Sequence, residues 1–236
     1  MSQDSRYHHI AIPFYADMVT DSLGMDSAQD CFDKKLFNQH APVHYKFNSI
    51  GYRTHPVCKF ITHPILVLGD SFTLGLGNHA HHRYSNILEQ QLAHQVLNFS
   101  LNGASNDWIC RKLQQLLAVF DPTAIVIHYT FSHRRERPQS HWHDNERTEC
   151  EPLYTTEQNF QNWYDNYQKI CTSVGNTKLI HSFIPRWHDA TVDYESLSRN
   201  VLEPITQLDF SRDGFHYGPR SHHALANAIT NLLAVV

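Results

Sequence analysis

The sequence contains no apolar run that approaches the roughly 18 consecutive residues needed by a membrane-spanning helix. It also has no excess of positive charge, because 19 Lys and Arg residues stand against 23 Asp and Glu residues, a formal net charge of −4. Binding to nucleic acid or to a membrane surface through bulk charge needs a cationic face, so we expect neither partner. The N-terminal region has no basic segment followed by an apolar one, because acidic residues and histidines interrupt it. The sequence therefore favours a cytoplasmic protein.

Cysteines are few and poorly spaced for cross-links or metal sites. There are five of them, an odd number, and no two stand in a C-x-x-C pattern, which argues against a disulfide framework and a zinc knuckle. We expect Cys110 to be a small core residue. Histidines are abundant instead, 19 in all, and their protonation predicts a loss of stability in mild acid through self-repulsion. The histidines of 79–82 and 222–223 show no converging acidic or thiol partners, so no metal and no other cofactor is expected.

The 236 residues are enough for one generous domain with its own core. Apolar runs of strand length alternate with helical patterns, which predicts an α/β fold with a parallel sheet. The expected strands are 65–68, 96–99, 124–127 and 178–184, and the expected helices are 83–94, 106–119, 155–175 and a last one from Ser221, with Pro219 at its start.

Two regions depart from this alternation. Residues 1–60 have no clear period, and we expect 1–47 to form an extension packed on a main domain of 48–236. Residues 132–152 are polar and charged, and we expect them to form a long loop inserted after the third strand.

Three short motifs carry residues suited to nucleophilic chemistry. Gly69-Asp70-Ser71 directly follows the first strong strand, so Ser71 would stand at the sheet edge where α/β proteins bind ligands. Asp213 and His216 precede the last helix, at a spacing that lets the carboxylate hold the imidazole from behind. Gly103 follows the second strand and could direct a backbone N–H at an oxyanion, while Ser105 or Asn106 could cap the next helix, the cap being the favoured role for the Asn106 side chain.

Taken together, these motifs resemble the SGNH, or GDSL, hydrolase family. The resemblance lies in Gly69-Asp70-Ser71-Phe72-Thr73, in Gly103, in the Asp213-x-x-His216 pair, and in their order along the chain. The stretch Asn48-Ser49-Ile50-Gly51-Tyr52-Arg53 is also similar to an N-x-x-G-aromatic-R stretch of many members.

The resemblance implies a three-layer α/β/α sandwich with a flavodoxin-like parallel sheet and hydrolysis of an ester through an acyl-serine. Ser71 would be the nucleophile, His216 the general base and acid, and Asp213 the residue that orients His216. The backbone N–H groups of Ser71 and Gly103 would donate to the oxyanion. Asp70, Asn106, Thr130 and Arg134 are assigned to substrate binding.

One family block is altered. After the third strand the family usually shows G-x-N-D, whose asparagine is the third oxyanion donor, but this chain has no asparagine there. Ser132 is the nearest residue for that role, and Thr130 or His133 could donate instead. Losing such a donor typically costs about 2.7–4 kcal/mol in the transition state, so a weak esterase is an open alternative.

The inserted loop also carries arginines, among them Arg134, that suit an anionic or sugar-like substrate group, although a solvated or partner-packing loop is favoured. We therefore interpret the chain as a serine hydrolase of a small-molecule ester, such as an O-acyl group on a carbohydrate, with a homo-oligomer left open. The alternatives are an SGNH-fold binding or accessory module with little turnover and a metal-dependent phosphoesterase.

Overall fold

The computed structural model of the chain describes residues 7–56, 61–136, 154–185, 197 and 200–234. Its centre is a parallel four-stranded sheet in the order β4-β3-β5-β6. The strands are β3 (Ile65–Gly69), β4 (Val96–Ser100), β5 (Ala124–Tyr129) and β6 (Lys178–Phe183). Every residue of these strands is buried except the first residue of β6. Strands buried on both faces need helices on both sides, as the apolar runs predicted.

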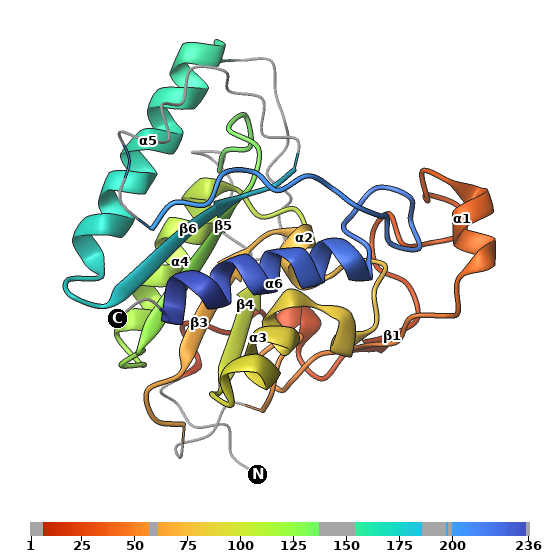
Figure 1. Ribbon diagram of the computed structural model, residues 1–236, viewed down its shortest axis with the longest axis horizontal. Coiled ribbons are helices and arrows are strands. Elements are labelled where there is room, and N and C mark those ends of the chain that lie inside the picture. The colour runs from red at the N-terminus through yellow and green to blue at the C-terminus, as the bar shows by residue number, and fades with distance from the viewer. Residues whose placement is uncertain (1–6, 57–60, 137–153, 186–196, 198–199, 235–236) are drawn as a thin grey trace.

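Four helices cover the two faces of the sheet, and each lies where the sequence pattern predicted a helix. They are α3 (Tyr84–Leu92), α4 (Asn106–Leu117), α5 (Thr156–Ser173) and α6 (Pro219–Ala234). Helix α3 packs against α6, and α4 packs against α5, so the two pairs form separate layers. Figure 1 shows α3 and α6 in front of the sheet. The predicted three-layer α/β/α sandwich is therefore confirmed.

The strand order predicts where a ligand would bind at the sheet. The chain passes from β3 to its neighbour β4 and then crosses back over β3 to form β5, the order of flavodoxin-like sheets. In such sheets, ligands bind outside the carboxyl ends of the strands, where the connections diverge to opposite faces. Here that point lies between the ends of β3 and β5, beside Ser71 and Thr130.

The N-terminal segment forms small elements that the sequence pattern left unplaced. They are a 3-10 turn (Pro13–Tyr15), the antiparallel pair β1 (Val19–Thr20) and β2 (Tyr45–Lys46), and helix α1 (Lys34–Gln39). Ile10 and Ile12 are fully buried in the main core. Figure 1 places α1 and β1 at the end of the molecule away from α5.

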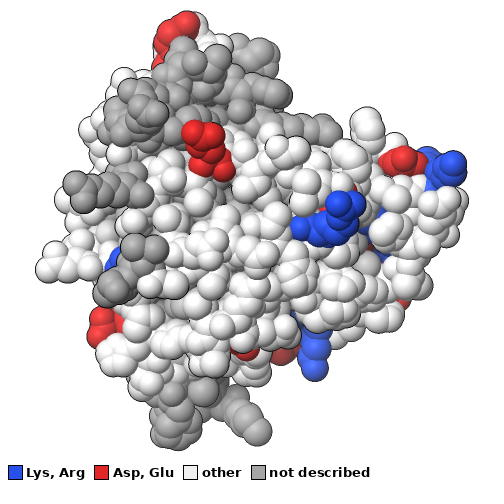
Figure 2. Space-filling model, viewed as in Figure 1, with Lys and Arg blue, Asp and Glu red and all other residues white. Residues whose placement is uncertain are grey.

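Two further short elements follow β3, namely helix α2 (Ser71–Leu74) and a 3-10 turn (Ala80–His82). Most of the predicted inserted loop, from residue 137 to residue 152, lies outside the described residues. No helix in the part of the chain described is long and apolar enough to cross a bilayer. On the face shown in Figure 2, acidic and basic side chains occur as small separate groups on a largely uncharged surface.

Candidate active site

The nucleophile turn begins where β3 ends. Asp70 caps α2 by accepting a hydrogen bond from the N–H of Phe72 at 3.0 Å, which makes Ser71 the first residue of the helix. Gly69 cannot carry a side chain, because a Cβ there would lie 2.1 Å from the hydroxyl of Thr73 and 3.0 Å from the carbonyl oxygen of His128. Glycine at this position thus lets the end of β3 pack closely against Thr73 and the backbone of His128, directly before Ser71.

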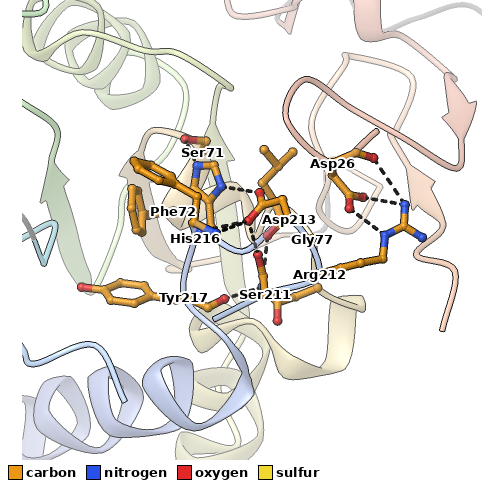
Figure 3. A network of polar contacts seen from close by, with 12 residues as sticks. Asp26, Ser71, Phe72, Gly77, Ser211, Arg212, Asp213, His216 and Tyr217 are labelled. Atoms are coloured by element: carbon orange, nitrogen blue, oxygen red, sulfur yellow. Dashed lines mark hydrogen bonds and ion pairs between the residues drawn. The ribbon is translucent and has the colours of Figure 1, made fainter. Parts of the chain in front are cut away.

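A second turn brings His216 to the serine across 145 positions of sequence. The Nε2 atom of His216 lies 2.8 Å from Oγ of Ser71, and its Nδ1 lies 2.6 Å from Oδ2 of Asp213. The three side chains are joined in this order in the network drawn in Figure 3. The His216 ring also packs on Phe72, with 4.6 Å between ring centroids, which restricts its rotation. The residues predicted to form a nucleophile, base and orienting acid are therefore brought together.

The Asp213 carboxylate is held in its ionised form. Burial alone would raise the pKa of Asp213, but hydrogen bonds and charge from His216, with the N–H of Phe215, hold that pKa below its usual value. Its Oδ1 accepts from the Ser211 hydroxyl at 2.7 Å and from the backbone N–H groups of Phe215 and His216 at 2.8 and 3.0 Å. An ionised Asp213 accepts the Nδ1–H of His216, which leaves Nε2 to accept the Ser71 hydroxyl proton.

Asp70 links the nucleophile turn to the end of β5. Its Oδ2 accepts from the Thr130 hydroxyl at 2.6 Å and from Nη1 of Arg134 at 2.9 Å. Asp70 and Thr130 are fully buried, and their mutual hydrogen bond positions the turn beside Ser71; their assignment to substrate binding stays a prediction. The Thr130 hydroxyl donates its single proton to Asp70, so it has none left to donate to an oxyanion. Arg134 remains partly exposed, stacks on Phe131, and keeps its assignment to substrate binding as a prediction.

Asn106 has a different role from the one expected. The cap of α4 is Ser105, whose hydroxyl accepts from the N–H of Trp108 at 3.1 Å. The Asn106 amide instead bonds the Thr130 backbone twice, donating to its carbonyl and accepting from its N–H at 3.1 Å each. Asn106 is buried and bonded to the main chain, so it fixes the end of β5; its assignment to substrate binding stays a prediction.

The predicted oxyanion donors follow the neighbouring strands. Gly103 lies in the turn after β4, half-buried, at a φ of +79°, a conformation that glycine adopts readily. Ser132 lies half-buried in the turn after β5. His133, the other alternative, is exposed and stacks on Phe131. Donation to an oxyanion by Ser71, Gly103 and Ser132 stays a prediction.

The N-terminal segment is hydrogen-bonded to the loop that carries Asp213 and His216, here called the base loop. The sequence motifs did not indicate this contact. Asp26 receives Nε of Arg212 at 2.7 Å and the Tyr45 hydroxyl at 2.5 Å, and the Tyr45 oxygen accepts the N–H of Gly77 at 2.7 Å. The backbone N–H of Arg212 closes the ring by donating to the carbonyl of Gly77 at 3.2 Å. Figure 3 shows Asp26 and Arg212 beside the Asp213 loop. This Asp26 ring ties the segment after α2 to the loop that carries Asp213.

The N-x-x-G-aromatic-R stretch has a structural explanation. The Asn48 side chain accepts from the N–H groups of Ile50 and Tyr52 and thereby holds the turn. Gly51 is required, because a Cβ would lie 2.1 Å from the carbonyl oxygen of Ile12. The buried Arg53 guanidinium then donates to four backbone carbonyls, those of His44, Leu74, Gly75 and Asn78. Two of these carbonyls lie at the end of α2, so the stretch supports the helix that begins at Ser71.

Metal and thiol chemistry find no support in the described part of the chain. No group of three or more His, Cys, Asp or Glu side chains is arranged to hold a metal among the described residues. The rings of His79 and His81 stack, and the His82 ring meets both of them edge to face. Cys110 is buried, and burial raises the pKa of its thiol to about 11, as befits a core residue.

Comparison with known proteins gives a likeness of fold. No family model and no curated protein matches the chain. Among solved structures, a protein assigned to the lipolytic G-D-S-L family from Desulfitobacterium hafniense is similar over 72% of this chain and 98% of its own, with a TM-score of 0.50 and 12% identity. A family two carbohydrate esterase from Clostridium thermocellum, solved with cellohexaose, is similar over 76% of this chain and 66% of its own, with a TM-score of 0.52 and 13% identity.

The fold and the site thus define an α/β/α protein with a Ser-His-Asp arrangement at the carboxyl edge of a parallel sheet. The chain has the SGNH/GDSL hydrolase fold, and the resemblance seen in its motifs is confirmed at this level.

Proposed function

We propose that the protein is a serine hydrolase of the SGNH/GDSL type that cleaves a small ester through an acyl-serine intermediate. The observation that carries this proposal is the unbroken hydrogen-bonded chain from Ser71 through His216 to Asp213, with separations of 2.8 and 2.6 Å. Each of the three is buried at the sheet edge where ligands of such folds bind. The structural neighbours include esterases, which agrees with this chemistry.

The first half of the reaction forms the acyl-serine. Oγ of Ser71 attacks the ester carbonyl carbon while its proton passes to Nε2 of His216. Asp213, whose pKa is held low, stabilises the imidazolium that results. The carbonyl oxygen becomes an oxyanion, to which the N–H groups of Ser71 and Gly103 would donate. The bond to the alcohol oxygen then breaks, and His216 gives its proton to the departing alcohol.

The second half releases the acid. Water attacks the acyl carbon and passes a proton to His216. The bond to Oγ of Ser71 then breaks, His216 returns the proton to Oγ, and the carboxylic acid leaves. No metal or organic cofactor is needed in either half. We place the acyl group on a carbohydrate or a similar metabolite, with Arg134 at the Ser71 site to receive an anionic or sugar-like group of the substrate.

A fluorophosphonate probe tests the proposal. We expect the probe to label the wild-type protein and the Ser173→Ala variant, in which an exposed serine is replaced, but not Ser71→Ala. Hydrolysis of p-nitrophenyl acetate should follow the same pattern and be indifferent to EDTA. Absence of both labelling and hydrolysis in a folded wild-type protein would overturn the proposal, and activity lost to EDTA would favour a metal-dependent phosphoesterase.

The altered third block supports one alternative, an SGNH-fold binding or accessory module with little turnover. The Thr130 hydroxyl is engaged by Asp70, which leaves Ser132 as the side-chain donor nearest the family position. If this donor contributes nothing, activity should be lower by about 10²–10³-fold than with a complete oxyanion hole. An acetylated monosaccharide bound by the protein but not hydrolysed would favour the module.

A further inference from the structure

A cavity of about 330 Å³ lies between the N-terminal segment and the edge of the sheet formed by β4 and α3. It is separate from the Ser71 site, because its walls come from residues 44–56, 80–86 and 96–98. Arg53 and Arg83 form part of its wall, and Lys46 and His55 stand at its exposed side. Basic side chains thus gather around this cavity although the chain carries a net charge of −4.

The two arginines are buried without a carboxylate bonded to them among the described residues. Arg53 and Arg83 are each only 3% exposed. The Arg53 guanidinium donates only to backbone carbonyls, the closest being that of Asn78 at 2.7 Å. Arg83 donates through Nε to the carbonyl of Ala80 and through Nη1 to that of Arg53. Neutral carbonyls satisfy the hydrogen bonds, and Asp26 with Tyr45 near Arg53 and Glu89 near Arg83 offset the two charges only in part, which is costly in a buried site.

The nearby acids are committed to other partners. Glu89 bonds the N–H of Val96 at 2.9 Å and Nε2 of His55 at 2.8 Å. Asp26, on the other side, is bonded by Arg212 and Tyr45 in the Asp26 ring.

The protonation behaviour of the arginines agrees with this incomplete compensation. Burial lowers the pKa of Arg53 to about 10 and that of Arg83 well below its ordinary value. The charge of Arg53 lowers the pKa of Arg83 further, while Glu89 partly offsets both effects on Arg83.

We propose that this cavity binds a small oxyanion, the carboxylate or phosphate group of a metabolite, between Arg83 and Lys46. The Nη2 group of Arg83 has no hydrogen-bond partner among the described residues and is free to donate to such a group. Asn86 and Thr54 supply further polar groups on the wall. A guanidinium and an ammonium group together suit an oxygen-rich anion. The proposal does not depend on esterase activity.

The anion site would also be coupled to α2, the helix that begins at Ser71, because Arg83 and Arg53 both contact the end of that helix. A Cβ on Gly75, the residue that ends α2, would lie 2.4 Å from the Arg83 side chain, so Arg83 packs directly on that glycine. Arg53 holds the carbonyls of Leu74 and Gly75 at the same end. An anion that neutralises these arginines should stabilise the end of α2 opposite Ser71.

Titration with inorganic phosphate and, separately, with acetate tests the proposal, using thermal unfolding and calorimetry at constant ionic strength set with chloride. We expect at least one of the two anions to give saturable binding with a rise in melting temperature. Arg83→Gln should weaken this binding about tenfold or more, because a charge-assisted hydrogen bond is lost. Lys46→Gln replaces an exposed residue and should weaken the binding severalfold without disturbing the core.

Matched controls separate this site from others. Lys35→Gln, which removes an exposed lysine on α1, should bind the anion as the wild type does. If Arg83→Gln does not fold, the contrast between Lys46→Gln and Lys35→Gln decides the matter. The absence of saturable binding of both anions, or binding lost in Arg134→Gln but kept in Lys46→Gln, would overturn the proposal. The latter outcome would place the anion at the Ser71 site.

Discussion

The Asp213 carboxylate accepts four hydrogen bonds, one of which orients the imidazole of His216. Replacing Asp213 with Asn would put an amide N–H opposite Nδ1 and favour the tautomer whose Nε2 carries the proton. That tautomer cannot accept the Ser71 proton, so we expect kcat for p-nitrophenyl acetate to fall about 10³–10⁴-fold. The exposed Asp165→Asn serves as the control and should leave kcat unchanged. A loss in Asp213→Asn of less than about tenfold would contradict the assigned role.

Arg134 donates to the Asp70 carboxylate, whereas its neighbour Arg135 stacks on Tyr154 and donates to the carbonyl of Gln158. Removing the Arg134 guanidinium takes one charge-assisted hydrogen bond from a fully buried carboxylate. We expect Arg134→Ala to lower kcat/KM by about 10–100-fold, and Arg135→Ala to change it little. Steady-state kinetics on one ester compares the two variants. Equal losses of kcat/KM would contradict a role of Arg134 in holding Asp70 or binding substrate.

Among the elements, the N-terminal segment and the base loop depend on each other through the Asp26 ring. Asp26→Asn would leave the Arg212 guanidinium buried without its counter-charge, so we expect the free energy of unfolding to fall by about 3–5 kcal/mol. Urea denaturation measures the change. Asp21→Asn, which alters an exposed carboxylate in the same segment, should shift it by less than about 0.5 kcal/mol. A loss of less than about 1 kcal/mol in Asp26→Asn would show that the Asp26 ring does not stabilise the loop that carries Asp213.

How much could be predicted from sequence differs between these elements. The strands and helices of the sandwich follow from local hydrophobic period, which is why residues 65–68 and 106–119 were placed within a few positions of β3 and α4. Ser71, Asp213 and His216 were found because each lies in a short motif at a strand end or before a helix.

The rest depends on contacts that no local pattern carries. Asp26 and Arg212 are 186 positions apart, and nothing around either of them marks a partner. Asn106 looked like a helix cap because it stands at the start of α4, yet its bond to Thr130 depends on where β5 ends. Residues 7–55 lacked a period because they wrap over other elements with short pieces, and the hydrophobic positions follow the surface they cover.

For the molecule as a whole, histidine protonation links stability to pH through a route different from surface repulsion. His128 and His181 are fully buried, and burial lowers the pKa of each to about 4. Burial also lowers the pKa of His222, aided by the charge of Arg83. These groups stay neutral in the folded protein below pH 6.5, while their counterparts in the unfolded chain take up protons near that pH. The free energy of unfolding is therefore undiminished by these histidines above about pH 6.5, and it falls as the pH decreases towards 4.

We expect the free energy of unfolding to fall by about 1 kcal/mol for each of His128 and His181 between pH 7.5 and 5.5. Urea unfolding at both pH values measures the loss, and His181→Gln should reduce it, whereas the exposed His9→Gln should not. Repulsion among surface histidines would weaken in high salt, because 1 M salt shortens the screening length to about 3 Å. Desolvation of buried imidazoles is insensitive to salt, so a loss that persists in 1 M salt identifies the buried histidines as its source. A loss abolished by salt would instead identify repulsion among surface histidines as the cause.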